Sequence, residues 1–174
     1  MSQENVEIVR ALIPPPDADV ARLLRDDDLF EQVKAGAEPL VASDVESVAA
    51  WQGGDARTYA GIDGFRKLWL DWLEPWTVYH ASADEIIDQG DRVLVLARDR
   101  ARRAETDAEF ELQSGSLWEF EDGRLVRVEF FRNRVQALQA AGLREYAQDH
   151  PRRRGKGHPS GGLGGQPRGE HKPG

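Results

Sequence analysis

The sequence contains no cysteine and a single methionine among its 174 residues. Without cysteine there is no disulfide, no thiolate metal site and no cysteine nucleophile. Long apolar runs are missing too, since the longest one, Val93–Ala97, is far shorter than the ~20 residues that a membrane-spanning helix needs. The N-terminus, "MSQENVEIVR", has neither the basic start nor the apolar core of a secretory signal. We therefore expect a cytoplasmic protein without a membrane segment.

Motifs of nucleotide, cofactor and metal sites are also missing. The stretch "GGLGG" near the C-terminus follows no predicted strand and opens no predicted helix, so it is not a phosphate-binding loop. The sequence has no GxGxxG, no Walker lysine and no nucleophile elbow. No cluster of His, Asp and Glu has the spacing of metal ligands. We expect neither a cofactor nor a bound metal.

Charge is divided unevenly along the chain. The net charge is −8, but residues 150–174 carry a net charge of +5, so the rest carries −13. An acidic body argues against nucleic-acid binding, because phosphate contacts require clustered Lys and Arg. Residues 147–174 are rich in Gly, Pro and basic side chains and have almost no large apolar residue. We predict one folded domain over residues 1–146 and a disordered basic tail over 147–174.

Helical periodicity recurs through the first half of the chain. Pro14–Pro16 ends a first amphipathic helix, and Asp17 or Asp19 can cap a second one. Asp28 is a plausible cap for a third helix, which Gly36 would end. A fourth helix, capped by Asp63 and ended by Pro75, places Phe65, Leu68, Trp69, Trp72 and Leu73 on one face.

The second half of the chain has the two-residue period of strands. An earlier strand is predicted at Ser43–Trp51, before a "GGD" turn, and a helix over "RVQALQAAGL" ends the domain. "DQGD" and "EDGR" have the composition of hairpin turns. Helices followed by consecutive hairpin strands are typical of an α+β fold, with helices on one face of an antiparallel sheet. The later strands are predicted at Val78–Ile87, Arg92–Ala101, Phe110–Phe120 and Arg124–Arg132.

Several strings resemble those of SnoaL-like domains in the nuclear-transport-factor-2-like superfamily, which also includes ketosteroid-isomerase-like proteins. The matching strings include "ENVEIVR", "YAGIDGFRKLWLDWLEPW", "IIDQGDRVLVLARDR", "LWEFEDGRLVRVEFF" and "RVQALQAAGL". The resemblance covers about residues 4–143. It implies a cystatin-like α+β barrel, in which a curved antiparallel sheet forms a cone-shaped pocket closed by N-terminal helices. It also implies a small hydrophobic ligand and a homodimer.

The resemblance directs attention to Asn133, where the last strand ends. SnoaL-like cyclases have a catalytic Asp at the matching position, and an amide cannot transfer a proton as a carboxyl does. Asn133 can cap the following helix, make a polar contact in the pocket, or orient a reacting oxygen. Strand alternation places Glu129 and Phe131 on the same face as Asn133. If that face lines the cavity, Glu129 is the candidate base; otherwise it belongs to a solvated sheet face or a dimer interface.

Six residues form the predicted binding set, and several of them have a structural interpretation as well. Trp69 and Trp72 either pack in the core or line a ligand cavity. Tyr59 either packs in its Gly-rich turn or donates a hydrogen bond in the pocket, and His80 is either structural or a proton shuttle. Trp118 and Phe131 complete the set.

Two hypotheses about function remain open from the sequence. The first is a SnoaL-like protein that binds a hydrophobic carbonyl compound and catalyses a cofactor-independent isomerisation, cyclisation or dehydration by acid–base chemistry. The second is a non-catalytic ligand-binding or dimerisation module of the same fold, which the amide at Asn133 favours. A third, an adaptor for a partner protein, rests on fold analogy alone.

Overall fold

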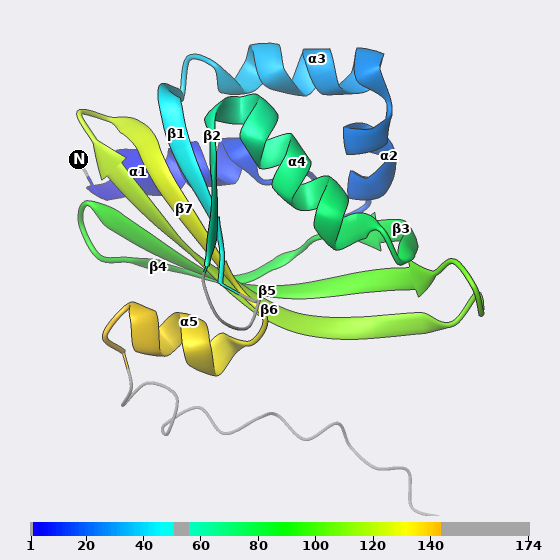
Figure 1. The fold of residues 1–174 in the computed structure, drawn as a ribbon. Coiled ribbons are helices and arrows are strands. Elements are labelled where there is room, and N and C mark those ends of the chain that lie inside the picture. Colours follow the sequence, from blue (N-terminus) through cyan, green and yellow to red (C-terminus); the bar gives the residue numbers. More distant parts are fainter. Residues whose placement is uncertain (1, 51–55, 144–174) are drawn as a thin grey trace, which may run out of the picture.

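The strands of this protein form one curved sheet, with helices on both of its sides (Figure 1). The computed structural model describes residues 2–50 and 56–143; the predicted tail and the "GGD" turn lie outside these ranges. The described elements are α1 (Ser2–Leu12), α2 (Val20–Arg25), α3 (Asp27–Ala37), β1 (Val41–Ala49), β2 (Arg57–Ala60), α4 (Gly61–Leu73), β3 (Trp76–His80), β4 (Ala83–Asp88), β5 (Arg92–Arg103), β6 (Glu109–Glu121), β7 (Arg124–Phe131) and α5 (Arg134–Ala140).

The predicted α+β class and curved sheet are confirmed, with differences in how the strands pair. The order is β2-β1-β7-β6-β5-β3, and β4 also pairs with β5. The region predicted as one strand, Val78–Ile87, is two strands that pair with opposite halves of β5, separated by Ala81 and Ser82. The short strand β2 was not predicted. β1 and β7 are parallel, so the sheet is not purely antiparallel.

The helix ends follow the capping rules, but two predicted caps were wrong. Asp19 caps α2, accepting a hydrogen bond from the Ala21 N–H at 3.0 Å. The cap of α3 is Asp26 rather than Asp28, and this helix continues through Gly36 to Ala37. Helix α4 begins two residues before Asp63, with no side-chain cap. Asp63 instead forms an ion pair with Lys34 of α3, which ties these two helices together.

Hairpins connect the later strands as the sequence predicted. The turn between β6 and β7 contains Asp122 and Gly123, both with positive φ, of 48° and 72°. Positive φ at both central positions is the signature of a type I′ turn, which matches the twist of the paired strands.

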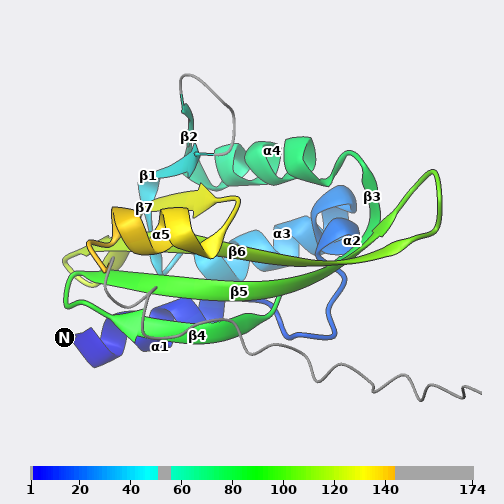
Figure 2. The ribbon, with the colours of Figure 1, turned by 90° about the horizontal axis from the view of Figure 1, so that it is seen from below.

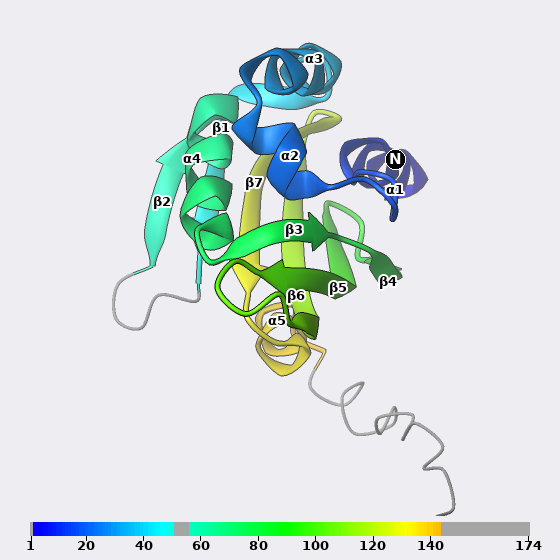
Figure 3. The ribbon, with the colours of Figure 1, turned by 90° about the vertical axis from the view of Figure 1, so that its right-hand side faces the viewer.

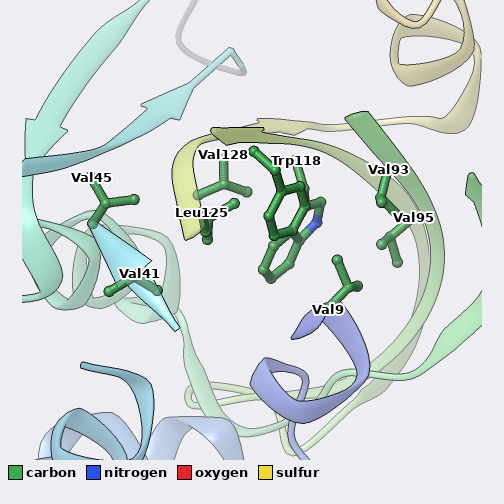
Figure 4. Close-up of a cluster of buried hydrophobic side chains, with 9 residues drawn as sticks. Val9, Val41, Val45, Val93, Val95, Trp118, Leu125 and Val128 are labelled. Atoms are coloured by element: carbon green, nitrogen blue, oxygen red, sulfur yellow. The ribbon is translucent and has the colours of Figure 1, made fainter. Parts of the chain in front are cut away.

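Helices α1–α4 cover the concave side of the sheet, and α5 lies on the opposite side (Figures 2 and 3). Alternate side chains of β5 point to opposite faces of the sheet. Val93 and Val95 face the concave side, whereas Leu94 and Leu96 pack beneath α5. On the concave side, Trp118 lies at the centre of an apolar cluster (Figure 4). Its other labelled members are Val9, Val41, Val45, Val93, Val95, Leu125 and Val128.

No helix within the described residues is both long enough and apolar enough to cross a lipid bilayer.

The fold predicts that Gly115 of β6 cannot be replaced by alanine without cost. A Cβ there would collide with the Cβ of Ala137 in α5 and come within 3.3 Å of the Val95 carbonyl oxygen. We expect Gly115→Ala to lower the free energy of unfolding by about 1–3 kcal/mol in urea denaturation, since overpacking forces neighbours to move. The matched control is Gly36→Ala in α3, where the new Cβ meets nothing within 4 Å. It should raise stability by about 0.5–1 kcal/mol.

Adding Ala137→Gly to Gly115→Ala should restore part of the lost stability, because it removes the colliding methyl group. Equal stability of the two single glycine-to-alanine variants would contradict the close packing of α5 on β6.

Candidate functional site

Two adjoining cavities lie between the concave face of the sheet and helices α1–α4. The first, here called the sheet chamber, has a volume of about 160 Å³ and is lined mainly by α4 and strands β3–β7. The second, the helix chamber, has a volume of about 420 Å³ and lies between α1–α4 and strands β1, β6 and β7. The two chambers are neighbours, because seven residues belong to the lining of both: Leu12, Ile13, Pro14, Phe65, Trp69, Ala81 and Trp118.

Asp99 of β5 is the buried carboxyl group of the sheet chamber. It is only 3% exposed. Its Oδ2 atom accepts hydrogen bonds from the Tyr79 hydroxyl and the Ser114 hydroxyl, both at 2.9 Å. Its Oδ1 atom is buried and has no hydrogen-bond partner among the described residues. One oxygen of this carboxyl group is therefore held in place, and the other is available to a ligand.

Burial raises the pKa of Asp99 above its usual range, because the charged form loses its hydration. The hydrogen bonds from Tyr79 and Ser114 oppose this shift. The Ser82 backbone amide and the positive charge of Arg134 oppose it too. Burial, and then the Asp99 charge, raise the pKa of the Tyr79 hydroxyl, which therefore stays protonated and remains a hydrogen-bond donor.

Aromatic rings line the rest of the sheet chamber. Trp69 contacts Tyr79 and Phe130 edge to face, with ring centroids 5.8 and 5.5 Å apart, and Phe65 lies 6.2 Å away. The Trp69 Nε1–H is buried and has no acceptor among the described residues. Trp118, by contrast, donates its Nε1–H to the Ser116 hydroxyl at 2.8 Å. The chamber thus combines apolar walls with one unpaired acceptor and one unpaired donor.

Four of the six residues in the predicted binding set line the sheet chamber, namely Trp69, Trp72, Trp118 and Phe131. Tyr59 does not: its hydroxyl donates to Asp71 at 2.9 Å, and its backbone packs against Gly64.

His80 also lies away from the sheet chamber. Its Nδ1 atom is 3.0 Å from the Ala18 carbonyl oxygen, an acceptor, so Nδ1 carries the proton. The ring borders a separate polar hollow of about 360 Å³, whose lining includes Arg100 and Glu111.

The two predicted catalytic residues, Glu129 and Asn133, line neither chamber. Glu129 is paired in register with Leu117, which packs under α5 on the convex side of the sheet. Asn133 is the N-cap of α5, and its Oδ1 atom accepts a hydrogen bond from the Gln136 N–H at 2.9 Å. Neither side chain is placed where it could touch a ligand in the cavity.

A bulge in the β6–β7 pairing, between Glu119 and Phe120, decides which face of β7 points inward. Leu125 belongs to the concave cluster, and so does Val128, three residues later instead of two or four. Val128 and Phe130 face the cavity, so Glu129 between them faces away from it, and Phe131, which packs in the cluster under α5, borders the sheet chamber only where β7 ends.

Sequence reasoning missed Asp99, Tyr79 and Ser114 as site residues. A usable signal was present in "VLVLARDRARR", where Val93, Val95, Ala97, Asp99 and Ala101 share one strand face. An acid on the same strand face as four small or apolar residues is predicted to be buried, which is unusual for a carboxyl group. The flanking arginines, which lie on the other face, concealed this pattern.

Within residues 2–50 and 56–143, no group of three or more His, Asp or Glu side chains is arranged to hold a metal ion.

Comparison with known proteins identifies the family. Residues 19–128 match the model of the SnoaL-like domain. Comparison with curated protein sequences gives no significant match.

Solved structures share the fold at low sequence identity. A protein from Jannaschia sp. CCS1, provisionally assigned as a SnoaL-like polyketide cyclase, is 15% identical with a TM-score of 0.57, over 81% of this chain and 92% of that one. TerC, crystallised with polyporic acid, is 20% identical with a TM-score of 0.54, over 82% and 98%. IdmH from Streptomyces antibioticus, provisionally a polyketide cyclase, is 18% identical with a TM-score of 0.53, over 79% and 98%.

The raised pKa of Asp99 predicts how stability depends on pH. A carboxyl with a higher pKa in the folded state binds its proton more tightly there, so its contribution to stability falls as pH rises above the unfolded value of about 3.9. Asp99→Asn removes this titration. We expect the free energy of unfolding of Asp99→Asn, relative to wild type, to increase between about pH 4 and about pH 7 in urea denaturation. A constant or decreasing difference would show that the folded protein does not disfavour the Asp99 carboxylate.

The position of Asn133 predicts a structural role that substitution can measure. Asp caps helices as well as Asn does, so Asn133→Asp should leave the free energy of unfolding nearly unchanged. Asn133→Ala should lower it by about 0.5–2 kcal/mol, because the Gln136 N–H loses its acceptor. Chemical denaturation of the two variants gives the comparison. A larger loss for the Asp variant than for the Ala variant would argue against capping.

Proposed function

This chain belongs to the SnoaL-like domain family, and we propose that it binds a mainly apolar carbonyl compound in the sheet chamber and moves a proton on it through Asp99. The observation that carries the proposal is the buried Asp99 carboxyl, with one oxygen unpaired inside an apolar cavity. Concave, apolar pockets with a few convergent polar groups are the usual sites of small-molecule binding.

Asp99 has the chemistry of a general base for a carbon acid. Its Oδ1 atom takes a proton from the carbon next to the carbonyl, and the electron pair of that C–H bond moves toward the carbonyl oxygen. Tyr79 and Ser114 hold the Oδ2 atom, so the carboxylate stays oriented while Oδ1 reacts. The protonated Asp99 then returns its proton to another atom of the same molecule. The raised pKa of Asp99 brings it closer to the neutral range that suits a base working near pH 7.

Trp69 supplies the donor for the developing oxyanion. Trp69 lines both chambers, and its Nε1–H has no acceptor among the described residues, so it can donate to a carbonyl oxygen without breaking an existing bond. The surrounding rings are apolar, and a hydrogen bond is stronger in such surroundings than in water. Isomerisation, dehydration and aldol-type ring closure all begin with this proton abstraction. The last of these fits the polyketide-cyclase names of two structural neighbours.

A non-catalytic ligand-binding protein is the alternative, and the amide at Asn133 favours it. The resemblance implies an acid at that position, and here Asn133 is exposed and caps α5. Under this alternative, Asp99 and Trp69 position a ligand oxygen without any proton transfer. A homodimer and a cytoplasmic location stay predictions under both.

Hydrogen exchange at a ketone tests the proposed chemistry without knowledge of the natural substrate. Phenylacetone is a suitable probe, because a cavity of ~150 Å³ accommodates benzene and the adjoining helix chamber has room for the rest of the molecule. In D2O we expect the protein to accelerate deuterium incorporation next to the carbonyl, followed by proton NMR. Asp99→Asn should reduce this acceleration by a factor of about 100 or more, the usual contribution of a positioned base.

Glu129→Gln is the matched control for Asp99→Asn. It makes a similar acid-to-amide change on the opposite face of the sheet, so exchange should continue at the wild-type rate. If phenylacetone binds without accelerated exchange, the non-catalytic alternative is supported. If exchange depends on Glu129 and not on Asp99, the assignment of the base is wrong.

A further inference from the structure

The helix chamber is the larger of the two cavities and has no part in the proton transfer proposed above. At about 160 Å³ the sheet chamber is smaller than the ~300–1,000 Å³ of ordinary small-molecule sites, whereas the helix chamber, at about 420 Å³, lies within that range. Trp69, Phe65 and Trp118 line both. A molecule with its carbonyl near Asp99 and more than a ring-sized body therefore has to extend past these three side chains into the helix chamber.

The walls of the helix chamber are almost entirely aliphatic and aromatic, with one buried polar exception. Ser47 of β1 is 0% exposed and lines this chamber. Its Oγ atom has no hydrogen-bond partner among the described residues. It shares its strand face with Val45 and is paired in register with Val128, and both of these belong to the concave cluster. Ser47 therefore lines an apolar cavity and carries a buried hydroxyl that has no partner among the described residues.

An unpaired buried hydroxyl lowers stability, since it has lost its hydrogen bonds to water. A bound molecule with a hydrogen-bonding atom at this place would restore the bond. The residues that carry these unpaired buried atoms line the cavity in series: Asp99 lines the sheet chamber, Trp69 lines both chambers and Ser47 lines the helix chamber.

We propose that the two chambers bind one elongated molecule with a carbonyl group at one end, an apolar body, and a second hydrogen-bonding atom at the far end that contacts Ser47. Ser47 is then a specificity-determining residue, which recognises the end of the ligand remote from Asp99. The inference rests on the proposed function for the position of the carbonyl end. It adds the length of the ligand and its second polar group.

Binding of two ketone series tests the proposal, with dissociation constants from calorimetry or tryptophan fluorescence. In the first series, butan-2-one to undecan-2-one, affinity should rise about fourfold per methylene group as the chain enters the helix chamber. The second series carries a hydroxyl group on the last carbon of each longer ketone. In wild type the longest hydroxyketone should bind about as tightly as the plain ketone of equal length, because the Ser47 hydrogen bond offsets the lost hydration of the added hydroxyl.

Ser47→Ala removes the proposed contact and little else. It should weaken binding of the longest hydroxyketone by about 3- to 10-fold and leave undecan-2-one unchanged. Ser47→Thr keeps the hydroxyl and should keep the hydroxyketone affinity. Ser43→Ala is the matched control, since Ser43 lies on the same strand but is exposed, and it should change neither series. Melting temperatures establish that each variant is folded.

Two results would overturn the inference. One is an affinity that stops rising after the shortest ketones, because the chain would then remain outside the helix chamber. The other is an equal loss of affinity for hydroxylated and plain ketones in Ser47→Ala. Either could occur while phenylacetone exchange still depends on Asp99, so failure here differs from failure of the proposed function. Conversely, a chain-length and Ser47 effect without Asp99-dependent exchange would support a non-catalytic binder of the elongated ligand.

Discussion

The central strands of this protein have to bury both of their faces, and the arrangement of the cavity follows from that constraint. β5 carries apolar side chains at odd and even positions alike. The even positions are covered by α5, which packs so closely that Gly115 leaves no room for a methyl group. The odd positions face α1–α4, which enclose the two chambers between themselves and the sheet. Tight packing on one side of the sheet thus accompanies a binding space on the other.

Local signals in the sequence predicted most helices and strands of the fold. Pairings between strands that are distant in the sequence could not be predicted in this way. Amphipathic periods, prolines and the Asp-Gly turn act over a few residues, which is why helices and hairpins were placed correctly. The parallel pairing of β1 with β7 joins segments about eighty residues apart, and no local pattern encodes it. The break at Ala81 and Ser82 has the same origin, because it reflects how β3 and β4 share a single partner strand.

The candidate site was predictable in part for a related reason. Trp69 and Trp118, which belong to the predicted binding set, do line a cavity, because large rings that face a sheet interior line whatever space remains there. The acid was missed because its assignment depends on the phase of a strand. A bulge of one residue in β7 turns Glu129 to the convex side, while the regular alternation of β5 brings Asp99 to the concave one.

Asp19 connects the architecture to the way a ligand can enter. Its Oδ1 atom accepts a hydrogen bond from the Ala21 N–H at the start of α2 and another from the Tyr79 N–H of β3, both at 3.0 Å. Lifting α2 away from the sheet would break the second of these bonds, which ties the helix to the strand whose Tyr79 hydroxyl holds Asp99. The helix chamber reaches the surface elsewhere, since Val33 of α3 lines it and is 38% exposed. A ligand of the kind proposed would, by entering beside Val33, leave the Asp19–Tyr79 bond and the carboxyl that Tyr79 holds undisturbed.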